Sequence, residues 1–165
     1  MIDKRKFFRS FLKNPLRTGS IIQSSPFLVR KMTEPVDWSK AKVIVEFGAG
    51  TGVITDKILE NMANDAILLC FEIDDNLYQK LVGRINDPRI KLVKDGAENL
   101  GKYLAKNNLA EVDCIISGLP LVSLPKKKSA QIITQIIKYL KRGGKYIQFQ
   151  YFLTSFNNLK NYFLT

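Results

Sequence analysis

Three glycines within five residues form the stretch of the sequence best suited to bind a ligand. They lie in Gly48-Ala49-Gly50-Thr51-Gly52, directly after an apolar, β-branched run at residues 43–47. Because the apolar residues that follow have helical spacing, the sequence predicts a strand, a tight turn and a helix that ends near residue 64. Such a junction presents backbone N–H groups and a helix N-terminus to a ligand at the carboxyl end of the strand.

The spacing of these glycines bears on which ligand they fit. The pyrophosphate loop of dinucleotide-binding proteins has the pattern G-x-G-x-x-G, whereas Val53 here takes the place of the third glycine. The sequence therefore argues against NAD. Taken alone, the glycine cluster is also compatible with an ordinary strand-to-helix turn.

Two further predicted strands are each followed by a carboxylate. The run at residues 66–72 ends in Glu72, 20 residues after Gly52, where a carboxylate can accept hydrogen bonds from both hydroxyls of a ribose. The run at residues 90–94 precedes Asp95-Gly96-Ala97, whose carboxylate can accept from the exocyclic amine of an adenine. An exposed glutamate and a simple Asp-Gly turn are the alternatives. Together with the glycine turn, the two carboxylates predict an adenosine site.

A proline-containing loop follows the fourth predicted strand, at residues 112–117. It reads Ser117-Gly118-Leu119-Pro120, and a second proline is Pro125. Prolines make such a loop extended and rigid, and in a doubly wound sheet it lies beside the glycine turn. Its carbonyl groups are therefore candidates for positioning a nucleophile, although an ordinary connection has the same composition.

The remaining elements complete an alternating pattern of strands and helices. Helices are expected at residues 27–32, 75–86, 99–107 and 126–140, and a fifth strand is expected at residues 145–151 after the turn Arg142-Gly143-Gly144. The predicted fold is α/β: a Rossmann-like, doubly wound, mostly parallel sheet with helices on both faces. Residues 1–35 are expected to form an amphipathic helix and a segment that covers the cofactor, and residues 36–165 a single globular unit.

The first residues predict a basic amphipathic helix at residues 4–13. At helical spacing, Phe7, Phe8, Phe11 and Leu12 share one face and basic residues share the other. This pattern is typical of a helix that lies in an anionic membrane interface. Docking on the helix's own domain and contact with RNA phosphates are the alternatives.

Composition restricts the chemistry and the compartment. Lys and Arg outnumber Asp and Glu by 26 to 15, so the net charge of +11 favours a polyanionic partner, either an anionic membrane or nucleic acid. The chain has no histidine, which argues against a metal site and against a histidine general base. Cys70 and Cys114 lie in apolar runs and are expected to be buried thiols. Without a membrane-span or signal-peptide pattern, we expect a cytoplasmic protein that can lie peripherally on the inner face of the membrane.

Taken together, these motifs resemble those of class I S-adenosylmethionine-dependent methyltransferases over residues 43–151. The resemblance implies S-adenosylmethionine as the cofactor and no metal. The residues that it implies for cofactor binding are Glu46, Gly48, Ala49, Gly50, Thr51, Gly52, Glu72, Ile73, Asp95, Gly96, Ala97, Ser117, Gly118 and Leu119.

Within this superfamily, four stretches resemble the bacterial phospholipid N-methyltransferases. They are Asn14-Pro15-Leu16-Arg17, Ser24-Ser25, Ser117-Gly118-Leu119-Pro120 and Gln148-Phe149-Gln150-Tyr151. The resemblance implies N-methylation of phosphatidylethanolamine at the membrane surface, with the N-terminal helix as the attachment.

The related ribosomal RNA adenine dimethyltransferases are the nearest alternative. Those enzymes have Asn-Leu-Pro followed by Tyr or Phe, where the Asn holds the target amine and the aromatic ring stacks on the base. Here the matching residues are Gly118, Leu119, Pro120 and Leu121, so a flipped adenine would lose both contacts. A protein that binds the cofactor without catalysis is a third possibility.

The C-terminal part of the sequence carries two further expectations. Because no histidine is present, Tyr151 is the predicted group for removing a proton from the amine. Methyltransferases of this fold usually end with two more strands, and these are missing after Tyr151. A natural short form and a truncation are both compatible with this, and the oligomeric state stays open.

Overall fold

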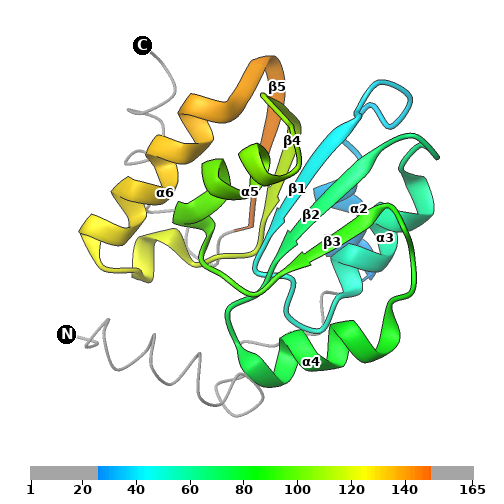
Figure 1. The fold of residues 1–165 in the computed structure, drawn as a ribbon, viewed down its shortest axis with the longest axis horizontal. Helices are drawn as coiled ribbons and strands as arrows, with labels where there is room; N and C mark the ends of the chain where they lie inside the picture. The colour runs from blue at the N-terminus through cyan, green and yellow to red at the C-terminus, as the bar shows by residue number, and fades with distance from the viewer. Residues whose placement is uncertain (1–25, 150–165) are drawn as a thin grey trace.

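The computed structural model describes residues 26–149, in which five parallel strands form one sheet (Figure 1). The strand order is β3-β2-β1-β4-β5. The strands are β1 (Val43–Phe47), β2 (Ile67–Phe71), β3 (Ile90–Val93), β4 (Val112–Ser117) and β5 (Leu140–Gln148). β1 lies between β2 and β4, with Phe47 level with both Phe71 and Ser117, so the loops after these three strands meet at one edge. The β1/β4 boundary, where the strand order reverses, is where open α/β sheets bind ligands.

Helices cover both faces of the sheet (Figure 1). The α-helices are α2 (Pro26–Thr33), α3 (Val53–Asn61), α4 (Asp75–Arg84), α5 (Leu100–Lys106) and α6 (Lys126–Tyr139), and the short 3-10 turns are η1 (Ala97–Asn99) and η2 (Leu121–Ser123). Alternate residues of each strand point to opposite faces. Val45 and Phe47 therefore pack with α5 and α6, whereas Ile44 packs in a second core with α2, α3 and α4. The predicted α/β fold is confirmed.

The predicted start of the fifth strand is wrong. Residues 142–144 were expected to be a turn after a helix, but α6 ends at Tyr139 and β5 begins at the next residue. Val112 pairs with Leu140 and Cys114 with Lys145, so residues 141–144 form a bulge opposite Asp113. Gly143 has a φ of 79°, which allows this irregularity within the strand instead of before it.

Two helices end earlier than predicted, since α3 ends at Asn61 and α4 at Arg84. The backbones of Met62 and Ile85 are already extended. Cys70 and Cys114 are buried free thiols, as predicted.

Several predictions lie outside the described residues. They concern the helix at residues 4–13, the stretches at residues 14–17 and 24–25, Gln150 and Tyr151, and the chain after Tyr151. Within residues 26–149, no helix has the length and apolar character of a membrane span, and no group of three His, Cys, Asp or Glu side chains is arranged to hold a metal ion.

Candidate cofactor site

The glycine loop (residues 48–52) connects β1 to α3 and is fixed to the end of β2. Gly48, Gly50 and Gly52 have φ values of 73°, 60° and 84°, a region that side chains with a Cβ strongly disfavour. The amides of Gly48 and Ala49 both donate to the carbonyl oxygen of Phe71, at 2.9 and 3.2 Å. A Cβ placed on Gly50 would meet no atom within 4 Å, so this side of the loop is open to a ligand.

Glu72 joins the loops that follow β1 and β2. Its side chain is buried, and one carboxylate oxygen accepts from the Gly50 amide at 2.7 Å while the other accepts from the Asp74 amide at 2.8 Å. Since each carboxylate oxygen has two lone pairs, both oxygens retain capacity for a hydroxyl donor. The next residue, Ile73, is 51% exposed and offers an apolar surface beside the carboxylate.

Asp95, after β3, is held by four donors. One oxygen accepts from the Gly96 amide at 2.7 Å and the Asn99 side chain at 2.8 Å, and the other from the Tyr103 hydroxyl at 3.0 Å and the Lys102 ammonium at 3.4 Å. Burial alone would raise the pKa of Asp95, but these hydrogen bonds outweigh burial and hold the pKa below its usual value. Asp95 is therefore a fixed, ionised acceptor.

The β4 loop (residues 117–121) lies directly against the glycine loop. The Gly118 amide donates to the carbonyl oxygen of Phe47 at 2.9 Å, and a Cβ on Gly118 would lie 3.2 Å from the carbonyl oxygen of Gly48. In turn, a Cβ on Gly48 would lie 2.8 Å from the Leu119 side chain. The two loops therefore pack closely at these two glycines.

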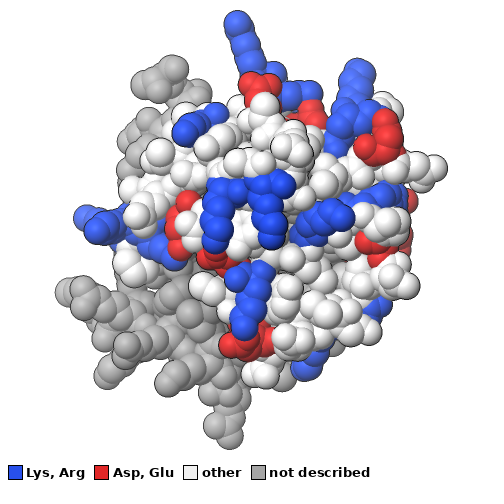
Figure 2. All heavy atoms as spheres, viewed as in Figure 1, with Lys and Arg blue, Asp and Glu red and all other residues white. Residues whose placement is uncertain are grey.

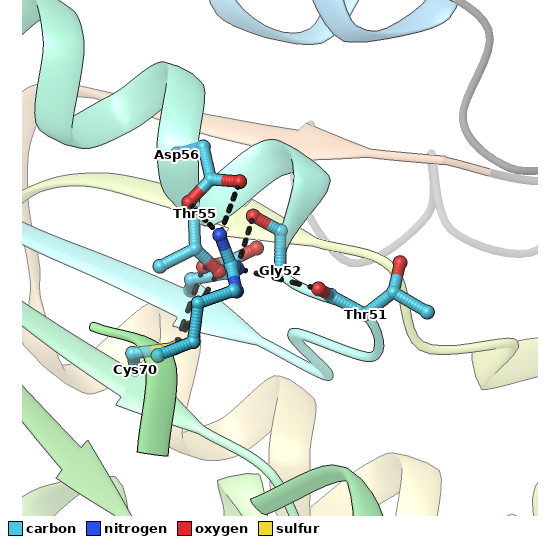
Figure 3. A network of polar contacts seen from close by, with 7 residues as sticks. Thr51, Gly52, Thr55, Asp56 and Cys70 are labelled. Carbon is cyan, nitrogen blue, oxygen red and sulfur yellow. Dashed lines mark hydrogen bonds and ion pairs between the residues drawn. The ribbon is translucent and has the colours of Figure 1, made fainter. Parts of the chain in front are cut away.

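Glu46, in β1, is the centre of a buried polar network with Thr55 and Cys70, which are labelled in Figure 3. It is 2% exposed, and one of its oxygens accepts from the Thr55 hydroxyl at 2.7 Å and from the Cys70 thiol at 3.4 Å. Burial raises the pKa of Glu46 to about 7, although both hydrogen bonds oppose this shift. Burial and the neighbouring Glu46 also raise the pKa of Cys70, so this thiol stays protonated.

Arg84, on α4, holds the glycine loop in place, and no motif in the sequence predicts this role. One guanidinium nitrogen binds both carboxylate oxygens of Asp56 at 2.7 Å, and another lies 3.3 and 3.4 Å from the carbonyl oxygens of Thr51 and Gly52 (Figure 3). Because Arg84 lies 28 residues from Asp56, no local pattern links the two. Asn99 and Tyr103, which hold Asp95, lie only four and eight residues from it, but the sequence analysis did not predict this role for either.

The structure brings the predicted cofactor residues together at the carboxyl ends of four adjacent strands. After or within β1 these are Glu46, Gly48, Ala49, Gly50, Thr51 and Gly52; after β2 Glu72 and Ile73; after β3 Asp95, Gly96 and Ala97; and at β4 Ser117, Gly118 and Leu119. Two carboxylate acceptors, an exposed apolar side chain and an open glycine are a donor and acceptor set that fits an adenosine. Tyr151 lies outside the described residues.

The comparisons with known proteins agree with this geometry. A protein-family model described as "Ribosomal RNA adenine dimethylase" matches residues 2–154. An ornithine lipid N-methyltransferase from Singulisphaera acidiphila is 30% identical over 149 residues, which cover 90% of this chain and 78% of the relative. A ribosomal RNA small subunit methyltransferase A from Sulfurihydrogenibium sp. is 30% identical over 93 residues, 56% of this chain and 35% of the relative. The chain therefore spans only part of the length of the ribosomal RNA enzyme.

A solved structure shows the same fold. A ribosomal RNA methylase from Streptococcus thermophilus superimposes with a TM-score of 0.59 at 18% identity, covering 82% of this chain and 75% of the other. The family match extends over nearly the whole chain, and the glycine loop and strand order are those expected for its members. The chain thus belongs to the ribosomal RNA adenine dimethylase family and is a class I S-adenosylmethionine-dependent methyltransferase.

Proposed function

We propose that this methyltransferase methylates the amino group of a membrane lipid. The observation that carries the proposal is the side-chain content of the β4 loop. Gly118 has no side chain to bind a base edge, and Leu121, which stands where the RNA enzymes have an aromatic ring, is 2% exposed and packed in the core. A loop without an amide or an aromatic platform suits a small, flexible amine better than a planar base.

The predicted cofactor residues have distinct proposed roles. Glu72 would accept from the ribose hydroxyls, and Ile73 would pack against the purine. Asp95 would accept a hydrogen bond from the adenine amine. This amine would take the place of the Lys102 ammonium, since the 3.4 Å contact of Lys102 is the longest of the four to the Asp95 carboxylate. The glycine loop would admit the methionine part beside the open face of Gly50.

The residues of this site need only to orient the amine and to exclude water. S-adenosylmethionine, when bound, supplies a methyl group already activated on a sulfonium, so no covalent enzyme intermediate is required. The β4 loop would hold the amine in line with that methyl group, which is a contribution of proximity and orientation. Gly118 and Leu119, which pack against the glycine loop, would help to exclude water from the amine and the methyl group.

Two lipid amines are candidate acceptors. The relative from Singulisphaera acidiphila is named for ornithine lipid, whereas the sequence motifs resemble enzymes that act on phosphatidylethanolamine. Both headgroups carry a primary amine, so we propose the class of acceptor and test the two lipids separately.

Association with an anionic membrane is also proposed, through the helix predicted at residues 4–13. In the view of Figure 2, basic side chains are spread over the described surface and acidic groups lie beside many of them. Ten ion pairs link such groups within residues 26–149. Because these pairs offset much of the local positive charge, the basic N-terminal segment is the better candidate for the membrane contact.

A transfer assay with three acceptors tests the proposal. The protein is incubated with methyl-labelled S-adenosylmethionine and phosphatidylglycerol vesicles that contain ornithine lipid, the same vesicles with phosphatidylethanolamine, or small-subunit ribosomal RNA. We expect label in one of the lipids. Deletion of residues 1–13 should abolish vesicle binding but leave cofactor binding intact, and vesicle binding that survives would contradict the role of that helix.

An RNA substrate is the second candidate function, favoured by the family description and by the matched ribosomal RNA enzyme. It predicts salt-sensitive RNA binding and methylated adenine. Label in RNA and none in either lipid would replace the lipid proposal. Cofactor binding without transfer to any acceptor would indicate a binding protein without catalysis.

Replacing Tyr151 with phenylalanine tests the predicted proton transfer. A protonated amine cannot attack the methyl group, so we expect kcat to fall roughly 100-fold while cofactor affinity stays within twofold. Measurement of kcat and Kd for the variant separates chemistry from binding. Unchanged turnover would remove Tyr151 from the mechanism and leave solvent as the proton acceptor.

A further inference from the structure

An amide side chain on the neighbouring strand β5 contacts the β4 loop. Gln148, at the end of β5, donates from Nε2 to the carbonyl oxygen of Leu119 at 2.7 Å and to its neighbour Phe149 at 2.6 Å. The same Leu119 oxygen accepts from the Leu121 amide at 2.9 Å. The Leu119 peptide is thus fixed by one contact within its own loop and one contact from β5.

The orientation of the Gln148 amide is fixed as well. The Tyr146 hydroxyl donates to Oε1 of Gln148, which leaves the NH₂ group to face the two carbonyl oxygens. Burial raises the pKa of Tyr146 above its usual value, so this hydroxyl remains a donor over the working pH range. The reverse amide orientation would face Oε1 against carbonyl oxygens and is disfavoured.

The contact between Gln148 and Leu119 also bears on the cofactor side of the site, because Leu119 packs against the glycine loop. The Leu119 side chain lies against the Gly48 backbone, at the position where any Cβ on Gly48 would clash with it. On the other side, the Phe149 amide donates to the carbonyl oxygen of Ser117 at 2.9 Å, which ties the end of β5 to the start of the loop. The loop is therefore connected to β5 at both Ser117 and Leu119.

We propose that Gln148 is a positioning residue for methyl transfer. It fixes the conformation of the β4 loop, and the loop in turn positions the incoming amine. In the RNA enzymes that this chain resembles, an amide side chain is part of the corresponding loop itself. Here that position is Gly118, and the amide comes from β5 instead. Gln148 would act by holding the Leu119 carbonyl in place rather than by touching the reacting atoms.

Three variants test this inference. Q148L removes the donor, and Q148E keeps the shape but faces a carboxylate against the Leu119 and Phe149 carbonyl oxygens. The control is Q135L, because Gln135 on α6 likewise holds one backbone group, the Gly101 amide at 2.9 Å, but on α5 and not on the β4 loop. Amide hydrogen exchange of Leu121 and Phe149 is measured by NMR, and each rate is divided by the wild-type rate at the same pH.

We expect both amides to exchange at least about tenfold faster in Q148L, and unchanged in Q135L. Q148E should match Q148L at pH 8 but approach the wild type near pH 5, because the carbonyl oxygens that face the new carboxyl raise its pKa and the protonated carboxyl can again donate to Leu119. On an active acceptor, kcat should fall about tenfold or more in Q148L with Kd for S-adenosylmethionine changed less than twofold.

The exchange and kinetic measurements test the inference independently of each other. The kinetic arm rests on the proposed function, whereas the exchange arm needs no acceptor. If wild-type protein methylated neither lipid nor RNA, the proposed function would fail and the exchange rates would still decide the role of Gln148. Wild-type exchange at Leu121 and Phe149 in Q148L, or equal rates for Q148E at both pH values, would overturn the inference.

Discussion

Replacing Glu72 with alanine is expected to weaken binding of S-adenosylmethionine at least about 100-fold. The variant loses the acceptor proposed for two ribose hydroxyls, and hydrogen bonds to a charged group contribute roughly 1.5–3 kcal/mol each. It also frees the amides of Gly50 and Asp74, which the carboxylate holds in place at 2.7 and 2.8 Å. Titration calorimetry of the variant and the wild type measures the effect.

Asp113 supplies a matched control for this prediction. Its carboxylate also accepts from two backbone amides, those of Lys42 and Val43 at 2.8 Å, but at the opposite, amino end of β1. D113A should therefore lose stability by a similar mechanism and keep its affinity for the cofactor. If E72A and D113A bound the cofactor equally well, Glu72 would be only a structural support for the loops.

The second large effect concerns Glu46 and pH. Burial raises the pKa of Glu46 from its ordinary value of 4.5 to about 7, so the folded state binds the proton more tightly than the unfolded chain. The resulting stability is fully present below pH 4.5 and is lost as pH rises through 7. Each unit of pKa corresponds to about 1.4 kcal/mol, so this group changes the free energy of unfolding by roughly 3 kcal/mol across that pH range.

E46Q should remove this pH dependence. Because the chain has no histidine, few other groups titrate between pH 5 and 8, and the carboxyl groups with lowered pKa values titrate below that range in both proteins. Urea unfolding is measured at half-unit steps of pH. From pH 4.5 to pH 8.5, the free energy of unfolding of E46Q should rise by roughly 3 kcal/mol relative to that of the wild type. A constant difference between the two proteins would show that Glu46 is not buried in its protonated form.

The fold could be predicted from sequence because its determinants are local. The apolar, β-branched run before Gly48 and the glycines after it determine both the strand and the turn, whatever the rest of the chain does. In contrast, the start of β5 depends on pairing with β4. The ion pair of Lys141 with Asp113 and the left-handed Gly143 stabilise a bulge that no window around residues 141–144 reveals.

The residues of the candidate site also fall into two groups, those that the sequence predicts and those that depend on tertiary packing. Glu72 is recognisable because it ends a predicted strand 20 residues after Gly52, and Asp95 because it directly follows the next predicted strand. The groups that hold the site, such as Arg84 on the glycine loop and Gln148 on the β4 loop, act across 29 or more residues. Their side chains meet the loops only once the sheet has formed, so sequence spacing carries no signal of them.

A crystal structure with bound S-adenosylhomocysteine tests the central claim most directly. We predict the ribose hydroxyls within hydrogen-bonding distance of the Glu72 carboxylate and the adenine amine at Asp95, with the sulfur facing the β4 loop. A nucleoside bound at another edge of the sheet, or one that leaves Glu72 and Asp95 without contact, would contradict this account of the site.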